Sequence, residues 1–117
     1  MTDTQLFTFE RLDVFRAAEE ALRVVIKYRA RLRGLPGQIA GQLERAAVST
    51  ICNITEAAGR NTPGERRSRL SIARGEANEA GAMARIAQLF HVFSDEDYAT
   101  LRSTLLRVTW MLTAMMK

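Results

Sequence analysis

The sequence has little of what interrupts helices and little of what usually carries chemistry. Its 117 residues include two prolines, seven glycines, one cysteine and one histidine. Because Cys52 is alone, no disulfide can form within the chain, and nothing indicates an oxidising compartment. We expect Cys52 to be a small buried apolar side chain and His91 to be structural or exposed. A single histidine leaves few ways to build a nucleophile–base pair, which argues against an enzyme.

Long apolar runs are also absent. No segment reaches the roughly 20 continuous apolar residues of a membrane span. The first residues lack the basic and apolar regions that mark a signal peptide. We therefore expect a cytoplasmic protein that makes no contact with membranes.

The motifs of metal and cofactor sites are missing as well. Di-iron helical bundles use Glu-x-x-His pairs, and no Glu-x-x-His occurs here. A glycine-rich phosphate loop is missing too. We expect Glu56, Glu76 and Glu79 to pair with arginines such as Arg45 or Arg85 instead of holding a metal ion. The sequence therefore predicts no metal, no cofactor and no catalytic residue.

What the sequence does contain is a helical pattern. Hydrophobic residues make up 47% of the chain, and they recur at spacings of three and four over residues 11–32, 38–58, 62–92 and 95–117. Thr62 and Ser94 are expected to cap the last two helices, with Glu65 completing a capping box at Thr62. Short connections make neighbouring helices antiparallel. We predict an all-α, up-down-up-down four-helix bundle over residues 9–117, after a flexible tail of residues 1–8.

The third and fourth predicted helices carry more apolar surface than one buried face requires. The third has an alanine stripe and a second stripe of larger residues, and the fourth has apolar positions away from its main stripe. A second apolar face usually meets another molecule, so we interpret it as a contact between copies of the chain. The alternative is one wide buried face within the bundle. The candidate interface residues are Ala77, Ala80, Ala84, Phe90, Leu106 and Trp110.

Positive charge gathers in two places. The net charge is +4, and fifteen of the seventeen basic residues are arginine, whose planar guanidinium suits phosphate and carboxylate groups. One group closes the first helix, where cations suit the helix dipole. The other surrounds the start of the third helix, where the dipole opposes cations. We interpret this second group as a contact to a phosphate backbone; the alternative is a solvated face that pairs with acids of a neighbouring chain. Its members are Arg60, Arg66, Arg67, Arg69 and Arg74.

Two stretches resemble a known family. The run Phe9–Ala18 looks like its opening motif, and residues 45–49, 53–56 and 59–60 look like its central signature. The family comprises the four-helix bundle proteins first noted as reading frames within intervening sequences of bacterial 23S ribosomal RNA genes. The accessory variability determinant of diversity-generating retroelements is similar to them. The resemblance implies a homopentameric, barrel-like ring, which in the retroelement branch binds reverse transcriptase and nucleic acid.

Within the signature we expect Arg45, Asn53 and Glu56 to be structural. Asn53 and Glu56 lie three residues apart, so they share a helix face and are expected to join Arg45 or Arg60 in a hydrogen-bond network. The leading hypothesis is a homo-oligomer, pentameric by resemblance, that binds RNA, DNA or a nucleoprotein through its arginines. The alternative is a protein-only adaptor ring that docks a partner enzyme such as a reverse transcriptase. An enzyme with a carboxylate site is the third and weakest hypothesis.

Overall fold

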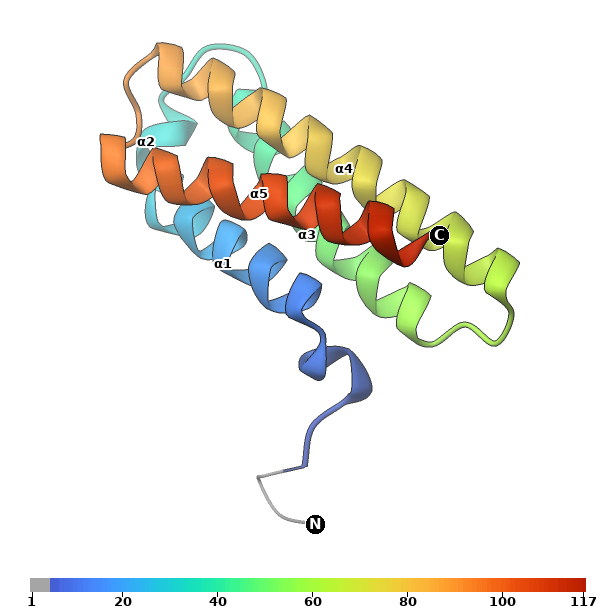
Figure 1. The fold of residues 1–117 in the computed structure, drawn as a ribbon. Helices are drawn as coiled ribbons and strands as arrows, with labels where there is room; N and C mark the ends of the chain where they lie inside the picture. The colour runs from blue at the N-terminus through green and yellow to red at the C-terminus, as the bar shows by residue number, and fades with distance from the viewer. Residues whose placement is uncertain (1–4) are drawn as a thin grey trace.

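Five α-helices form four antiparallel rods, because the first two continue one another. The structure is a computed structural model that describes residues 5–117, and it is all-helical over that range. A short 3₁₀-helix, η1, leads into the first rod, and Figure 1 shows the rods packed side by side. This confirms the predicted four-helix bundle. The elements are η1 (Thr8–Arg11), α1 (Asp13–Lys27), α2 (Arg29–Arg33), α3 (Ile39–Ala58), α4 (Pro63–Leu89) and α5 (Asp95–Met115).

The two predicted helix starts are confirmed. Thr62 Oγ1 accepts a hydrogen bond from Glu65 N at 3.2 Å, and Ser94 Oγ accepts one from Asp97 N at 3.1 Å. Each bond satisfies a backbone donor that the first helical turn leaves free. Within residues 5–117 the Glu65 side chain makes no return bond to Thr62, so only half of the predicted capping box forms.

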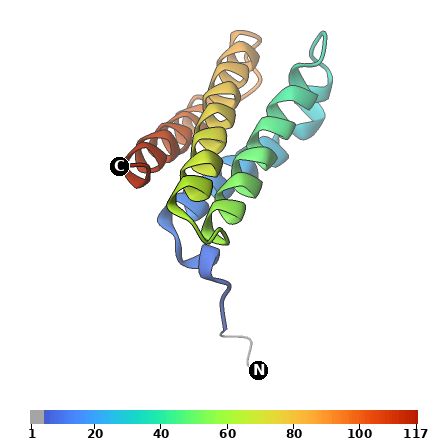
Figure 2. The ribbon, with the colours of Figure 1, turned by 90° about the vertical axis from the view of Figure 1, so that its right-hand side faces the viewer.

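Alanine lines the buried face of α4. Figure 2 shows α4 between α3 and α5, and small side chains allow such neighbours to approach closely. Ala77, Ala80 and Ala84 are at most 1% exposed. The prediction that these three residues contact a second copy is therefore wrong, because the chain's own core already covers them. For the alanine stripe, the alternative of a wide buried face is the correct one.

The beginning of the chain stands apart from the bundle. Of the predicted flexible tail, residues 1–4 lie outside the described residues. Residues 5–11, which we name the N-terminal arm, extend away from the four rods (Figures 1 and 2). Phe7 stacks on Phe9 with 5.2 Å between ring centroids, and Phe9 packs against Phe15 of α1 at 5.1 Å. The arm is thus anchored at its base by aromatic contacts.

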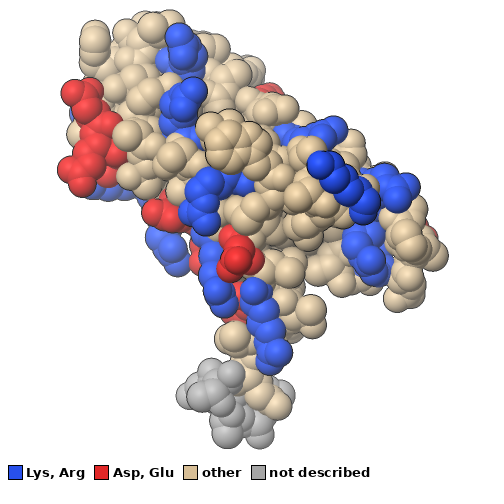
Figure 3. Space-filling model, in the orientation of Figure 1, with Lys and Arg blue, Asp and Glu red and all other residues tan. Residues whose placement is uncertain are grey.

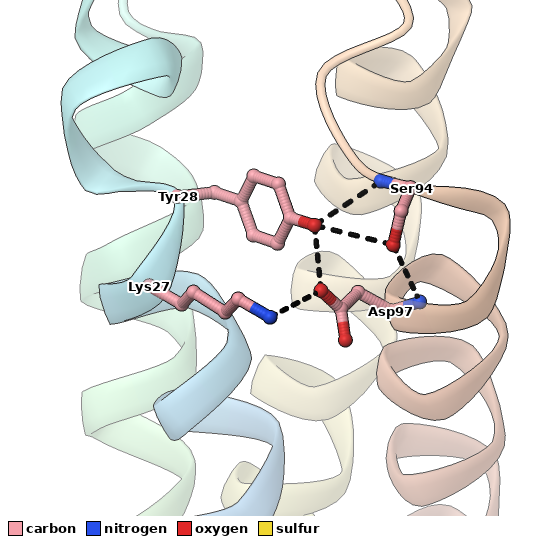
Figure 4. A network of polar contacts seen from close by, with 4 residues as sticks. All are labelled: Lys27, Tyr28, Ser94 and Asp97. Atoms are coloured by element: carbon pink, nitrogen blue, oxygen red, sulfur yellow. Dashed lines mark hydrogen bonds and ion pairs between the residues drawn. The ribbon is translucent and has the colours of Figure 1, made fainter.

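A polar network fixes the junction between α1 and α2 to the start of α5 (Figure 4). The Tyr28 hydroxyl donates to Asp97 Oδ2 at 2.6 Å and accepts from Ser94 N at 3.2 Å. The Lys27 ammonium lies 2.8 Å from the same carboxylate oxygen. These contacts join segments about seventy positions apart in the sequence, so they help to hold the first rod against the last.

The network changes the pKa of both charged members. The hydrogen bond from Lys27 is the main cause that lowers the pKa of Asp97, and the bond from Tyr28 adds to it. The same bond raises the pKa of Lys27. A carboxylate with a lowered pKa stabilises the fold above its unfolded-state pKa, and this contribution is lost as pH falls through the folded-state value. The network should therefore weaken on the acid side.

Replacing Asp97 with asparagine tests this network. At pH 7 the variant should melt at a lower temperature than the wild type, because Lys27 loses its partner. The difference should narrow as pH falls below the ordinary aspartate pKa of about 4 and through the lowered folded-state pKa, where the wild-type carboxylate also becomes protonated. Thermal melts followed by circular dichroism from pH 7 to pH 2 measure it. Asp95→Asn, in the same helical turn but outside the network, is the matched control. A difference in melting temperature between wild type and Asp97→Asn that stays constant from pH 7 to pH 2 would contradict the prediction.

Candidate nucleic-acid interface

The two groups of basic residues lie at opposite ends of the bundle. Lys27 contacts Asp97 in the first turn of α5, whereas Arg67 contacts Met116 just beyond its last turn. Helix α5 therefore separates the groups along its whole length. In Figure 3 basic side chains cover the end where α4 begins, and acidic side chains cover the end where α5 begins.

The group at the end of the first rod is engaged within the chain. Arg23 pairs with Glu19 at 3.1 Å and Arg29 with Glu44 at 2.8 Å. Arg31 donates to the carbonyl of His91 at 3.0 Å. With Lys27 bound to Asp97, four of the five basic residues of this group have a partner; the fifth is Arg33. Their positions have a structural explanation, as the helix dipole already suggested.

The group at the start of α4, which we name the arginine collar, comprises Arg60, Arg66, Arg67, Arg69 and Arg74. Two of its members share a single acid. Arg69 lies 3.1 Å from Glu56 Oε2, and Arg60 lies 3.6 Å from the same oxygen. One carboxylate neutralises only one of two guanidinium groups. The pair of arginines therefore keeps a positive excess.

The other members of the collar bind neutral oxygens. Arg66 donates to the Arg60 carbonyl at 3.3 Å, and Arg74 donates to Thr113 Oγ1 at 3.1 Å. Arg67 donates to the Met116 carbonyl at 3.2 Å, where the C-terminal end of α5 favours a cation. Within residues 5–117 none of these three forms an ion pair. Their charges are positioned but not neutralised.

The collar surrounds the first turns of α4 on two sides. On one side, Arg66, Arg67 and Lys117 line a depression of about 120 Å³ between the start of α4 and the end of α5. On the other side, Arg60 and Arg69 line a shallow hollow beside Gly64. The structure thus brings four of the five predicted arginines around the first two turns of α4, and Arg74 lies about one turn further along the helix. Such an end can hold several phosphate groups without reading base edges.

The signature residues behave differently from the expectation. Asn53 is buried, and its amide donates to the Ser49 carbonyl at 2.9 Å, one turn back in its own helix. Arg45 is exposed. The predicted network of Asn53, Glu56 and Arg45 is wrong, because the Asn53 amide is already satisfied within α3 and Glu56 instead reaches the two arginines of the collar. The expected pairing of Glu56 with Arg60 does form.

Several other candidates lie at the surface. Cys52 is exposed, which corrects its expected burial, because it shares a face of α3 with the exposed residues Val48 and Glu56, four positions away on either side. His91 is exposed and takes a left-handed backbone with φ of 56°. The expected pairing of Glu76 and Glu79 with Arg45 or Arg85 does not occur within residues 5–117.

Residues 5–117 offer neither a metal site nor a membrane-spanning helix. In that part of the chain no three side chains of His, Cys, Asp or Glu gather closely enough to hold a metal ion. None of its helices is both long and apolar enough to cross a membrane.

A groove between α4 and α5 is the feature that the sequence did not predict. It has a volume of about 270 Å³ and an apolar floor that includes Gly81 and Leu106. Arg85 and Arg102 stand at its edge. Near it, Trp110 is 63% exposed, and at the end of α4 Phe90 is 50% exposed. Phe90 and Trp110, two of the residues predicted at a contact between copies, are therefore exposed, in contrast to the alanines.

Known proteins resemble this chain in sequence and in fold. A family model described as 23S rRNA-intervening sequence protein matches residues 10–114. No curated protein matches at a significant level. A solved structure from Bacteroides thetaiotaomicron VPI-5482, a protein with unknown function from the S23 ribosomal protein family, has a TM-score of 0.78 and 22% identity, covering 89% of this chain and 98% of that chain. That likeness shows the fold, and the family model, which covers most of the sequence, shows that the chain belongs to the 23S rRNA-intervening sequence protein family.

Proposed function

We propose that this chain is a non-enzymatic, self-associating helical bundle that binds nucleic acid or a nucleoprotein through its arginine collar. The observation that carries the proposal is an excess of arginine at the start of α4, where the helix dipole disfavours cations. Within the described residues, the only ion pairs that the collar forms are those of Arg60 and Arg69 with Glu56. Arg66, Arg67 and Arg74 bind only neutral oxygens over residues 5–117, and a phosphate backbone would neutralise the charge that they keep.

Self-association is the second part of the proposal. Phe90 and Trp110 are large apolar side chains that the bundle leaves at least half exposed. Tryptophan is enriched among the residues that dominate binding energy at protein interfaces. The resemblance described above motivates a ring of five copies. In such a ring several collars would face one nucleic acid together.

The nucleic-acid part is tested by removing two collar charges. Arg66→Ala combined with Arg67→Ala should weaken binding to labelled RNA and DNA, measured by fluorescence anisotropy between about 50 and 200 mM salt. Each lost phosphate contact should reduce the slope of log affinity against log salt by about one. Arg16→Ala combined with Arg23→Ala removes the same charge from α1 and is the matched control.

The outcomes separate the two functional hypotheses. A loss confined to the collar variant supports phosphate binding at this end of the molecule. An equal loss in both variants would mean that net charge alone drives binding. Absence of binding at low salt would remove the nucleic-acid proposal and favour a protein-only adaptor whose arginines meet acidic side chains, for instance those of a reverse transcriptase.

Self-association is tested by native mass. The wild type at micromolar concentration should have a mass well above the 13.1 kDa of one chain, and five times that mass for the proposed ring. Trp110→Glu should shift the mass toward one chain, because a carboxylate cannot be buried unpaired in an apolar contact. Ile26→Glu is the matched control, since Ile26 is a similarly exposed residue on α1. A wild-type mass of 13.1 kDa would overturn this part.

A further inference from the structure

The carboxylate of Glu56 already holds two arginines of the collar. Its Oε2 atom lies 3.1 Å from Nη1 of Arg69 and 3.6 Å from Nη2 of Arg60, so guanidinium groups from α4 and from the connection after α3 meet at one oxygen. The side chains of Arg69, Arg60 and Glu56 are 37%, 40% and 46% exposed. A phosphate oxygen is bound by arginine in the same way. Glu56 therefore takes a place in the collar that a phosphate group would also take.

The five arginines of the collar fall into two classes. Arg66, Arg67 and Arg74 bind only neutral oxygens in the described part of the chain, so their charge is available to an external anion. The other two are engaged by Glu56. A phosphate group meets no competitor at the first class. At the second class it has to replace a carboxylate of the same protein.

The contacts of Glu56 are of a kind that a ligand can replace. Exposed ion pairs contribute little to stability, because water screens the charges and two long side chains lose conformational freedom. A strand that is already held by Arg66 and Arg67 keeps its neighbouring phosphates close to the remaining arginines, which raises their effective concentration. A single phosphate ion lacks this advantage. Replacement of the carboxylate therefore favours a ligand that carries several phosphates.

The surface beside Glu56 has room for the replacing anion. Arg60 and Arg69 line the shallow hollow beside Gly64, which has a volume of about 530 Å³. Glu56 is not among the residues that line it, so the carboxylate does not fill this space. Glu65 does line the hollow, but over residues 5–117 it forms no ion pair. Glu65 therefore repels an anion without occupying an arginine, whereas Glu56 occupies two.

We propose that Glu56 is an internal competitor of the nucleic acid: it holds Arg60 and Arg69 in the unbound protein and releases them to the phosphates of a bound strand. This inference rests on the nucleic-acid binding proposed above and names the residue that regulates that same site. It makes the collar respond to a strand with several neighbouring phosphates and only weakly to single phosphate ions. The opposite role, in which Glu56 positions the two arginines for the ligand, predicts the opposite effect of removing it.

Neutralising Glu56 tests the competition. Glu56→Gln keeps the size of the side chain and removes its charge, which releases Arg60 and Arg69. The affinity for labelled RNA and DNA, measured by fluorescence anisotropy at about 50 mM salt, should rise about threefold, as expected when an exposed ion pair no longer competes. The slope of log affinity against log salt should become steeper by about one, because a further arginine contacts phosphate. A fall in affinity would show that Glu56 positions the arginines and would overturn the proposal.

Removing the two arginines separates competition from simple repulsion. In a chain with Arg60→Ala and Arg69→Ala, the other three collar arginines still bind, but Glu56 has no arginine to hold. Glu56→Gln should then raise the affinity no more than the matched control Glu65→Gln does, since repulsion alone remains. Glu65→Gln removes the same charge at the same hollow, and its effect should be equal with and without the two arginines. A gain from Glu56→Gln that is also equal in both backgrounds would overturn the proposal.

Binding by the wild type separates failure of this inference from failure of the proposed function. Absence of binding at low salt in the wild type and in Glu56→Gln overturns both. Wild-type binding that Arg66→Ala with Arg67→Ala weakens, but that Glu56→Gln leaves unchanged, overturns only the competitor role. Binding by Glu56→Gln where the wild type shows none supports both. Thermal melts followed by circular dichroism confirm that every compared variant is folded.

Discussion

The size of the side chains on α4 sets the rest of the architecture. Five of its six buried residues are alanine, and the sixth is Leu70. A helix that presents methyl groups lies close to its neighbours, so the larger core residues have to come from the other helices, such as Leu43 of α3 and Leu101 of α5. Because the helices pack closely, side chains on the two flanks of α4 lie within reach of α3 and α5. Glu56 of α3 can therefore reach Arg69, and Thr113 of α5 can reach Arg74.

Charge is arranged along the bundle in a way that helix dipoles only partly explain. Acids begin α5 and Arg67 meets its C-terminal end, as the dipole favours. The basic residues at the end of the first rod follow the same rule and find partners. The arginine collar does not follow it for α4. Arg67 binds the C-terminal end of α5 and so has a structural role. This role follows from the packing of α5 beside α4, not from the sequence of α4 alone. Arg66 contacts only the Arg60 carbonyl, beyond the end of α3, and forms no ion pair within the described residues.

The sequence predicted what depends on periodicity and on local capping. Spacings of three and four fixed the four rods, and Thr62 and Ser94 marked two helix starts correctly. The sequence could not predict contacts between distant segments, such as the hydrogen bond from Tyr28 to Asp97. No sequence pattern indicates which polar groups meet across a bundle. Nor could the sequence show which of the two apolar stripes on α4 lies in the core and which lies at the surface. Alanines 77, 80 and 84 were expected at a contact between copies, and only their burial shows that the neighbouring helices already cover them. The arginines were located correctly as a group, but their partners were not.

Assembly and nucleic-acid binding depend on each other in this protein if both proposals hold. A single collar offers few phosphate contacts, and each is weakened by salt, so one chain alone would bind weakly near physiological ionic strength. Linking several collars in one particle makes later contacts intramolecular, which raises the overall affinity without any new contact. The collar lies at one end of the bundle, whereas the α4–α5 groove lies along its side. A contact between copies through the groove therefore leaves the arginines uncovered. This separation allows a self-associating bundle to present its charge to a nucleic acid.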